Sequence, residues 1–225
     1  MCAVPLRKPG RPRDPELEAR RRAQILDTAA KVFAGFGFAA TDVQVIADRL
    51  GVGKGTVYRY FPTKEQLFLA AVERGLEELT AEMDRIIDDP VNDAVEQTRR
   101  AIRAYLEFFR RRPEMAELFI QERAAFPHHH RPLYFSLQDT NDHECKHAAF
   151  WARLVASKKV RPMPAERFFA VVGDLLYGTI LTNLLSGRPA DPAAQTEDIL
   201  DVIMNGMLTD AERAKQAKHT SGGKR

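Results

Sequence analysis

The sequence predicts an all-α fold of about nine helices, and three observations support that prediction. Apolar residues recur at spacings of three and four positions along most of the 225 residues, which places them on one face of a helix. No segment alternates apolar and polar residues for long, so strands are not predicted. Hydrophobic residues make up 44% of the chain and charged residues 29%, values that exclude collagen-like and wholly disordered proteins.

The first third of the chain predicts three helices. Apolar residues between Ile25 and Phe36 form one stripe of an amphipathic helix that begins near Pro15 and ends around Gly35–Gly37. Two short helices follow, over about 42–50 and 54–61. Thr41 precedes the first and Gly51 ends it, whereas the second ends before Pro62, because a residue that precedes proline is pushed out of the helical region.

The rest of the chain predicts six longer helices and a polar tail. Thr63 and Gln66 form a capping box at the start of a helix that runs to about Asp88. Residues 210–225 carry no apolar face, and we expect them to be disordered. The remaining predicted helices cover 91–112, 113–125, 132–156, 164–186 and 191–208.

Charge is distributed unevenly along the chain. Residues 1–64 hold 12 Lys and Arg against 6 Asp and Glu, whereas residues 65–225 hold 22 against 25. This asymmetry is typical of a nucleic-acid-binding module attached to a near-neutral body, although a solvated basic face would give the same count. Only Cys2 and Cys145 are present, and no apolar run follows the basic N-terminus, so we expect a cytoplasmic protein without a signal peptide or membrane anchor.

The most apolar stretch lies at 168–185. It is interrupted by Asp174 and three polar residues, which a lipid-facing helix would carry at considerable cost. We therefore expect this stretch to be buried in protein, with no membrane partner.

Two short helices joined by a glycine-containing turn have the arrangement of a helix-turn-helix reader of double-stranded DNA. The second helix would enter the major groove, and Val57 and Phe61 would anchor it to its own small core. Its other residues supply cations and hydroxyls suited to bases and phosphates: Lys54, Thr56, Tyr58, Arg59 and Tyr60.

The run VIADRLGVGKGTVYRYFPTKEQL from Val45 to Leu67 resembles the DNA-binding signature of the TetR/AcrR family of transcriptional regulators. The resemblance covers about residues 20–70 and departs at Gly53, where the family often has Ser. It implies a ligand-responsive repressor that binds a palindromic operator as a homodimer and is released by a small molecule. It also implies that Thr41 and Gln44 touch the DNA backbone and that Lys64 meets a phosphate.

We therefore expect four parts of the chain. They are a flexible basic arm at 1–14, a helix-turn-helix DNA-binding domain at 15–62, a ligand-binding and dimerisation domain at 63–209 and the disordered tail at 210–225. Within the arm, the run from Pro9 to Arg13 resembles the core of an AT-hook, whose Arg11 and Arg13 would enter the minor groove of A·T-rich DNA. The alternative is a basic tail that adds affinity without reading sequence.

An enzyme is not predicted. The run GVGKGT at 51–56 suggests a phosphate loop, but Gly55 stands where that loop needs Ser or Thr, and Asp48 stands where it needs Gly. A helix rather than a strand precedes the run, which argues against a dinucleotide site. The main rival is a helical adaptor whose basic front binds an acidic protein or membrane surface.

Histidines suggest a second alternative, a regulator or adaptor that uses a metal. Asp139, His143 and His147 share one face of a helix, and Glu122 of the preceding helix could be a fourth ligand for zinc or nickel. The other interpretation is a polar stripe, or side chains that contact an organic inducer. We commit to no metal and to no cofactor other than an unknown small-molecule inducer.

Two groups of apolar residues carry the remaining expectations. Helices at 164–186 and 191–208 present faces that would pack against the same helices of a second subunit; a monomer with a self-contained core is the alternative. The residues of the dimer interface would be Phe168, Val172, Leu175, Leu176, Thr179, Ile199, Val202 and Ile203. An apolar or amphipathic inducer would contact aromatic residues, although most aromatics belong to the core. The expected pocket residues are Phe109, Phe119, Tyr134, Trp151 and Tyr177.

Overall fold

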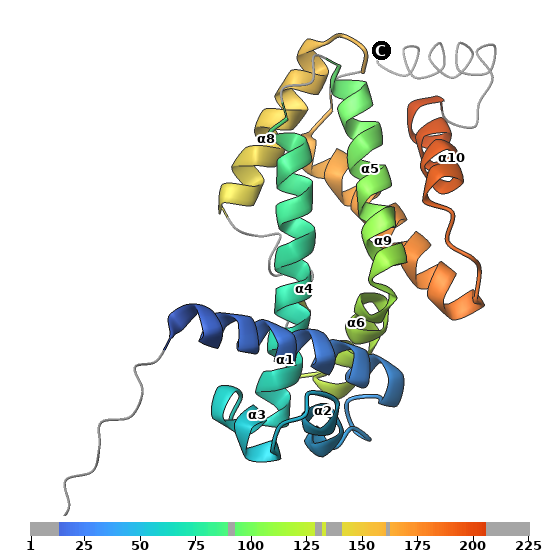
Figure 1. Cartoon of the computed structure of the whole chain (residues 1–225). Coiled ribbons are helices and arrows are strands. Elements are labelled where there is room, and N and C mark those ends of the chain that lie inside the picture. The colour runs from blue at the N-terminus through green and yellow to red at the C-terminus, as the bar shows by residue number, and fades with distance from the viewer. Residues whose placement is uncertain (1–13, 90–92, 129–131, 134–140, 161–162, 206–225) are drawn as a thin grey trace, which may run out of the picture. The chain divides into compact units, whose positions relative to one another are not determined.

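The computed structural model describes residues 14–89, 93–128, 132–133, 141–160 and 163–205. Nine α-helices and no strand are found in these residues (Figure 1), which confirms the predicted all-α class. The chain forms two compact units, residues 1–74 and 75–225. Helix α4 (Lys64–Ile87) contributes residues to both units.

The first unit contains α1 (Pro15–Phe36), α2 (Val43–Arg49), α3 (Lys54–Tyr60) and the start of α4. Sequence signals set the ends of α1 as expected: the carboxylate of Asp14 accepts hydrogen bonds from the first backbone N–H groups, and Gly37 ends the helix at a φ of 83°. Aromatic and aliphatic side chains of all four helices fill the core of this unit. They include Phe33, Ile46, Val57 and Phe68, each fully buried.

Helix α2 begins one residue later than the predicted range of about 42–50. Asp42 is its N-cap residue, and the Asp42 Oδ1 accepts a hydrogen bond of 2.8 Å from the Gln44 N–H. The Thr41 hydroxyl instead donates to the Gly37 carbonyl at 2.7 Å and closes the preceding turn. At the start of α4, the Gln66 N–H donates to the Thr63 hydroxyl at 3.1 Å, so this half of the predicted capping box is present.

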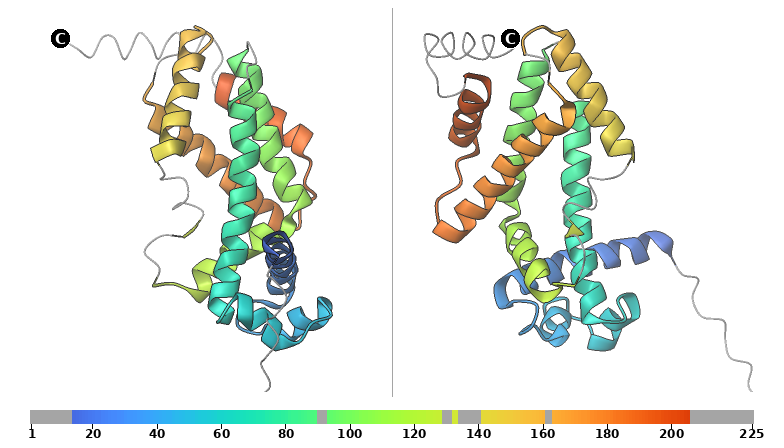
Figure 2. Two further views of the ribbon diagram at one scale, coloured as in Figure 1. Left: turned by 60° about the vertical axis from the view of Figure 1, so that its left-hand side comes forward. Right: turned by 180° about the vertical axis from the view of Figure 1, so that it is seen from behind.

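The second unit is built around α5. This helix packs against α6, α8, α9 and α10 (Figure 2). The bounds are α5 (Ala94–Arg111), α6 (Pro113–Ala125), α8 (Asn141–Ala156), α9 (Ala165–Ser186) and α10 (Pro192–Asn205). Helix α6 matches its predicted range, because Pro113 begins it as expected. Of the single helix predicted over 132–156, only the part from Asn141 is described as a long helix, since 134–140 lie outside the described residues.

The side chain of a buried glutamine from α5 caps the C-terminal end of α4. The Gln97 side chain is 1% exposed, and its amide Nε2 donates to the carbonyls of Ile86, Ile87 and Asp89 at 2.8, 2.8 and 3.0 Å. Arg153 donates to the Ile87 carbonyl as well, at 2.9 Å. These carbonyls lack intrahelical partners because they lie at or beyond the helix end, so α5 and α8 supply the donors.

Helix α9 has the length and apolar composition of a membrane span, and only 17% of its most apolar window is buried in the chain. Val171 is 58% exposed and Leu185 75% exposed. Burial of the whole stretch, as the sequence suggested, would therefore need a surface outside this one chain.

Candidate nucleic-acid interface and ligand cavity

Helix α3 separates an anchoring side from an exposed side. Val57 is fully buried and Phe61, just after the helix, is 3% exposed, so both belong to the core as predicted. On the other side, Tyr58 is 37% exposed and Arg59 is exposed. Thr56 and Tyr60 are half-buried, and the Arg59 guanidinium lies 5.3 Å from the centre of the Tyr60 ring.

Lys54 begins α3 and forms an ion pair with the residue that caps α2. Its Nζ lies 2.7 Å from Asp42 Oδ1. The hydrogen bond from the Gln44 N–H and the one from Lys54 hold the pKa of Asp42 below its ordinary value. The bond to Asp42 also raises the pKa of Lys54, so both groups are charged at neutral pH. The pair joins the N-terminus of α2 to that of α3.

The other residues expected to touch the DNA backbone have different environments. Gln44 is exposed, and its Nε2 donates to Asp48 Oδ1 at 2.7 Å. Thr41 is only 4% exposed, and its hydroxyl is engaged by the Gly37 carbonyl. Arg11 and Arg13 lie outside the described residues.

Lys64 is directed toward the loop before α2, which comprises residues 37–42. Its Nζ donates to the carbonyls of Ala39 and Thr41, each at 3.1 Å, and lies 4.8 Å from the centre of the Phe38 ring. The lysine predicted to meet a phosphate is therefore engaged by three neighbouring residues of its own chain.

The second unit contains a cavity of about 700 Å³ between α4, α5, α8 and α9. Its walls are mostly apolar, and Thr80, Thr98 and Tyr105 are among its polar lining residues. The other lining residues are Leu79, Met83, Ile87, Ala101, Ile102, Cys145, His147, Ala148, Phe150, Ala165, Glu166, Phe168, Phe169, Ala170, Val172, Gly173 and Leu176.

None of the four described aromatic residues expected in the pocket lines this cavity, and Tyr134 lies outside the described residues. Phe109 and Phe119 are buried with their ring centres 5.8 Å apart, and Phe119 stacks on Tyr177. Trp151 stacks on Phe168, and its indole N–H donates to the Met163 carbonyl at 2.9 Å. Large rings fill space in the core, whereas small residues such as Ala101 and Gly173 leave it open, and the sequence did not single these out.

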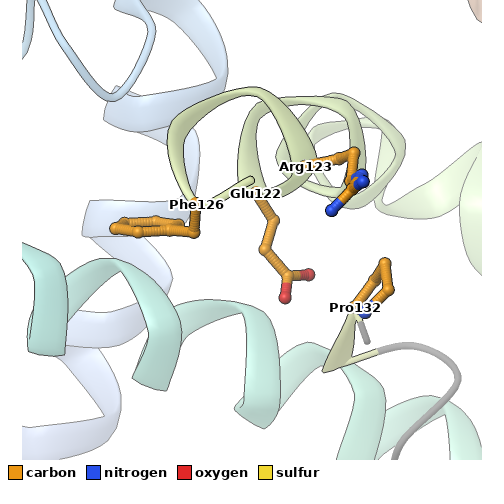
Figure 3. A pocket seen from close by; sticks show the side chains of 4 residues that line it. All are labelled: Glu122, Arg123, Phe126 and Pro132. Carbon is orange, nitrogen blue, oxygen red and sulfur yellow. The ribbon is translucent and has the colours of Figure 1, made fainter. Parts of the chain in front are cut away.

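The expected metal ligands are not brought together in the part of the chain that is described, where no group of three His, Cys, Asp or Glu side chains could hold an ion. Asp139 and the side chain of His143 lie outside the description. The His147 ring stacks on Phe169 with centres 4.2 Å apart. The Glu122 carboxylate, seen between Phe126 and Pro132 in Figure 3, is buried and accepts a hydrogen bond from the Leu133 N–H at 2.9 Å.

The residues expected at a dimer interface divide into two groups. Phe168, Val172 and Leu176 face inward and line the cavity, Ile199 is buried, and Ile203 packs on the cluster around Trp151. Leu175 is 36% exposed, Val202 is 52% exposed and Thr179 is half-buried. Leu175 and Val202, together with Val171 and Leu185, leave apolar surface exposed on α9 and α10.

Residues 25–71 match the family model described as "Bacterial regulatory proteins, tetR family". This segment of the chain is therefore similar to the DNA-binding part of TetR-family regulators. The matched residues hold the core of α1, all of α2 and α3 and the first two turns of α4, which are the elements that position Lys54, Tyr58 and Lys64.

Relatives with curated descriptions support this assignment. YhgD of Bacillus subtilis, an uncharacterized HTH-type transcriptional regulator, is 36% identical over 104 residues, which cover 46% of this chain and 53% of YhgD. The transcriptional repressor KstR of Mycolicibacterium smegmatis is 37% identical over 70 residues, 31% of this chain and 34% of KstR. The chain thus matches about half or a third of the length of these relatives. Both relatives are described as transcriptional regulators.

Solved structures show the same fold over most of the chain. The TetR-family regulator PfmR of Thermus thermophilus superposes with a TM-score of 0.66 at 24% identity and covers 82% of this chain and 99% of PfmR. The regulator FadR of Bacillus subtilis, in complex with stearoyl-CoA, has a TM-score of 0.64 at 18% identity and covers 83% of this chain and 99% of that one.

Proposed function

We propose that the chain is a cytoplasmic transcriptional repressor that binds a palindromic operator as a homodimer and releases it when a small molecule occupies the second unit. The exposed side of α3 carries this proposal. There, Tyr58 and Arg59 are presented by a helix whose other side is anchored through Val57 and Phe61. A rigidly seated helix with exposed cations and hydroxyls is what entry into a major groove requires.

We assign roles on α3 and α2 from these environments. Thr56, Tyr58 and Tyr60 supply hydroxyls to base edges or phosphates. Arg59 supplies a guanidinium group, which can donate two parallel hydrogen bonds. Lys54 keeps N–H groups available beyond its bond to Asp42, since an ammonium has three donors. Gln44 contacts the backbone from α2, and its exposed amide allows this. Thr41 has no hydroxyl to spare, so its contact would be through the loop that it closes.

Selection of bound fragments from randomised DNA at about 150 mM salt tests this function, because non-specific phosphate binding is weak there. We expect an enriched palindrome. On that operator, Tyr58→Ala should weaken binding by about 5- to 150-fold, the effect of losing a contact of about 1–3 kcal/mol. Phe36→Ala is the matched control, since Phe36 is an exposed aromatic residue on α1. No enrichment from a folded protein stripped of ligand would refute the proposal.

We further propose that the cavity binds an apolar or amphipathic molecule. A volume of about 700 Å³ with mostly apolar walls lies in the range of small-molecule sites, and the few polar residues of the wall, such as Thr80 and Glu166, can orient a polar group. The FadR structure holds stearoyl-CoA in a related fold, so fatty acids and their coenzyme A esters are the first compounds to test.

Trp151 provides the measurement for ligand binding. It is the only tryptophan in the sequence, and its ring stacks 4.5 Å from that of Phe168, which lines the cavity. Titration with stearoyl-CoA should change Trp151 fluorescence and release operator DNA. Ala101→Phe, which places a phenyl ring in the cavity, should weaken both effects, whereas Ala81→Phe on the exposed side of α4 should preserve them. An equal response in the two variants would place the ligand elsewhere.

A homodimer accounts for the exposed apolar surface of α9 and α10. Val171, Leu175, Leu185 and Val202 are each at least 36% exposed, and the same helices of a second copy would cover them as a four-helix bundle. Two-fold symmetry would also match a palindromic operator.

A further inference from the structure

We propose that Lys64 is a positioning residue. It holds the loop before α2, and through Asp42 and Lys54 this loop fixes the start of α3 relative to α4. The consequence for operator recognition rests on the DNA-binding function proposed above, whereas the clamp itself does not.

The Lys64 ammonium is directed toward its own chain. Its two hydrogen bonds go to the carbonyls of Ala39 and Thr41, 25 and 23 residues earlier in the chain. The Phe38 ring lies on the same ammonium at 4.8 Å, a distance at which a cation is attracted to an aromatic face. Two of the three N–H donors of the Lys64 ammonium are therefore used to hold its own chain.

The loop that Lys64 holds is connected to the start of α3. The Thr41 carbonyl that accepts from Lys64 is followed directly by Asp42, whose Oδ1 receives both the Gln44 N–H and the Lys54 ammonium. The Thr41 hydroxyl ties the other end of the loop to Gly37. A continuous series of polar contacts therefore connects the first residue of α4 to the first residue of α3.

The start of α3 depends on this connection between Lys64 and Lys54 because the helix has no side-chain cap. Gly53 is the N-cap of α3 and makes no side-chain hydrogen bond to the helix. A Ser or Thr at this place would fix the helix start through its own hydroxyl. Here the ion pair of Lys54 with Asp42 is the side-chain contact that fixes the start of α3, and it depends on the position of the loop that Lys64 holds.

A positioning role and a phosphate contact predict different results. A lysine bound to phosphate strengthens binding to every DNA sequence and contributes about 1 to the salt dependence of the binding constant. A residue that positions α3 strengthens binding to the operator, where the base contacts require alignment, and leaves binding to unrelated DNA unchanged.

The test compares Lys64→Met with Lys31→Met, which removes the same charge from an exposed position on α1. Hydrogen exchange of the free protein comes first: we expect exchange at the Thr41 and Gln44 amides to be accelerated about tenfold or more in Lys64→Met only. On DNA, the ratio of operator affinity to unrelated-DNA affinity should fall about five- to tenfold in Lys64→Met, with the salt dependence on unrelated DNA unchanged.

Asp42→Asn gives a second test with the opposite charge change. Asn retains the ability to cap α2 but loses the ion pair with Lys54. Removing a negative charge favours DNA binding in general, so electrostatics alone predicts tighter binding to both DNAs at an unchanged ratio. We expect the ratio to fall in Asp42→Asn as it does in Lys64→Met.

Two results would overturn the positioning role. One is unchanged amide exchange in Lys64→Met. The other is an equal loss of affinity for operator and unrelated DNA with a salt dependence lowered by about 2 per dimer, which would make Lys64 a phosphate contact. If the unaltered protein selects no operator, the proposed function fails, and the exchange measurement still decides whether Lys64 holds the loop.

Discussion

Substitution of Gln97 by Leu is the sharpest stability test of this fold. Leu is close to Gln in volume but lacks the amide that donates to Ile86, Ile87 and Asp89. The side chain is 1% exposed, so water does not reach the amide in the native structure. The substitution therefore removes the polar cap of α4 and leaves apolar packing almost unchanged.

The magnitude follows from counting the carbonyls left without a donor. Ile87 keeps its bond from Arg153, whereas Ile86 and Asp89 lose the bond from Gln97. A buried acceptor without a partner costs about 1–3 kcal/mol. Because these two carbonyls belong to half-buried residues, we expect a loss of about 2–4 kcal/mol in the free energy of unfolding, or about 5–12 °C in Tm for a protein of this size.

Urea unfolding followed by Trp151 fluorescence measures this loss directly, because Trp151 belongs to the same apolar cluster as Ile87. Gln24→Leu, at an exposed position on α1, is the control and should change stability by less than about 0.5 kcal/mol. A Gln97→Leu protein as stable as this control would show that the end of α4 does not depend on the Gln97 amide.

Three further predictions concern charge, assembly and the N-terminal arm. The pKa of Asp42 is lowered, chiefly by the hydrogen bond from the Gln44 N–H and then by Lys54. The stabilising effect of the Asp42 carboxylate is therefore complete above pH 3.8, the ordinary pKa of this group, and is lost as the pH falls through the lower native pKa. The difference in Tm between the unaltered protein and Asp42→Asn should accordingly shrink between about pH 6 and about pH 2.5. Val171→Glu, at a position 58% exposed on α9, should convert a dimer to monomers in sedimentation velocity, while Ala193→Glu on α10 should not. Deletion of residues 1–13 should cost more affinity on A·T-rich than on G·C-rich flanks, and an equal loss would identify the arm as an electrostatic tail.

Local signals in the sequence predicted most of the helix ends. Pro113 begins α6 and Gly37 ends α1 as expected, because proline and glycine act on the backbone at their own positions. The Thr63 cap was predicted because its hydroxyl bonds to a backbone N–H only three residues further along the chain. The start of α2 was predicted one residue too early, since Thr41 and Asp42 are both capable of capping and only the turn to Gly37 selects between them.

Long-range contacts were not predictable in this way. The direction of Lys64 depends on carbonyls 25 and 23 residues away, and nothing in the spacing around Lys64 reveals them. The residues that line the cavity also escaped the sequence, because a cavity is formed by residues that leave space, such as Ala101 and Gly173. Phe109 and Phe119, which were expected in the pocket, pack on one another, in line with the expectation that most aromatic residues belong to the core.

Helix α4 is the element through which a bound ligand would change operator affinity. Its C-terminal half lines the cavity through Leu79, Met83 and Ile87, and its first residue holds the loop before α2. A ligand changes operator affinity only by the difference in its own affinity for the two states, and a coupling of about 1–3 kcal/mol would give about 5- to 150-fold. Loss of the Lys64 bonds would break this link at one end. We therefore expect Lys64→Met to retain ligand binding, measured by Trp151 fluorescence, while the ligand-induced change in operator affinity is reduced; a full ligand response in Lys64→Met would mean that the coupling does not pass through this lysine.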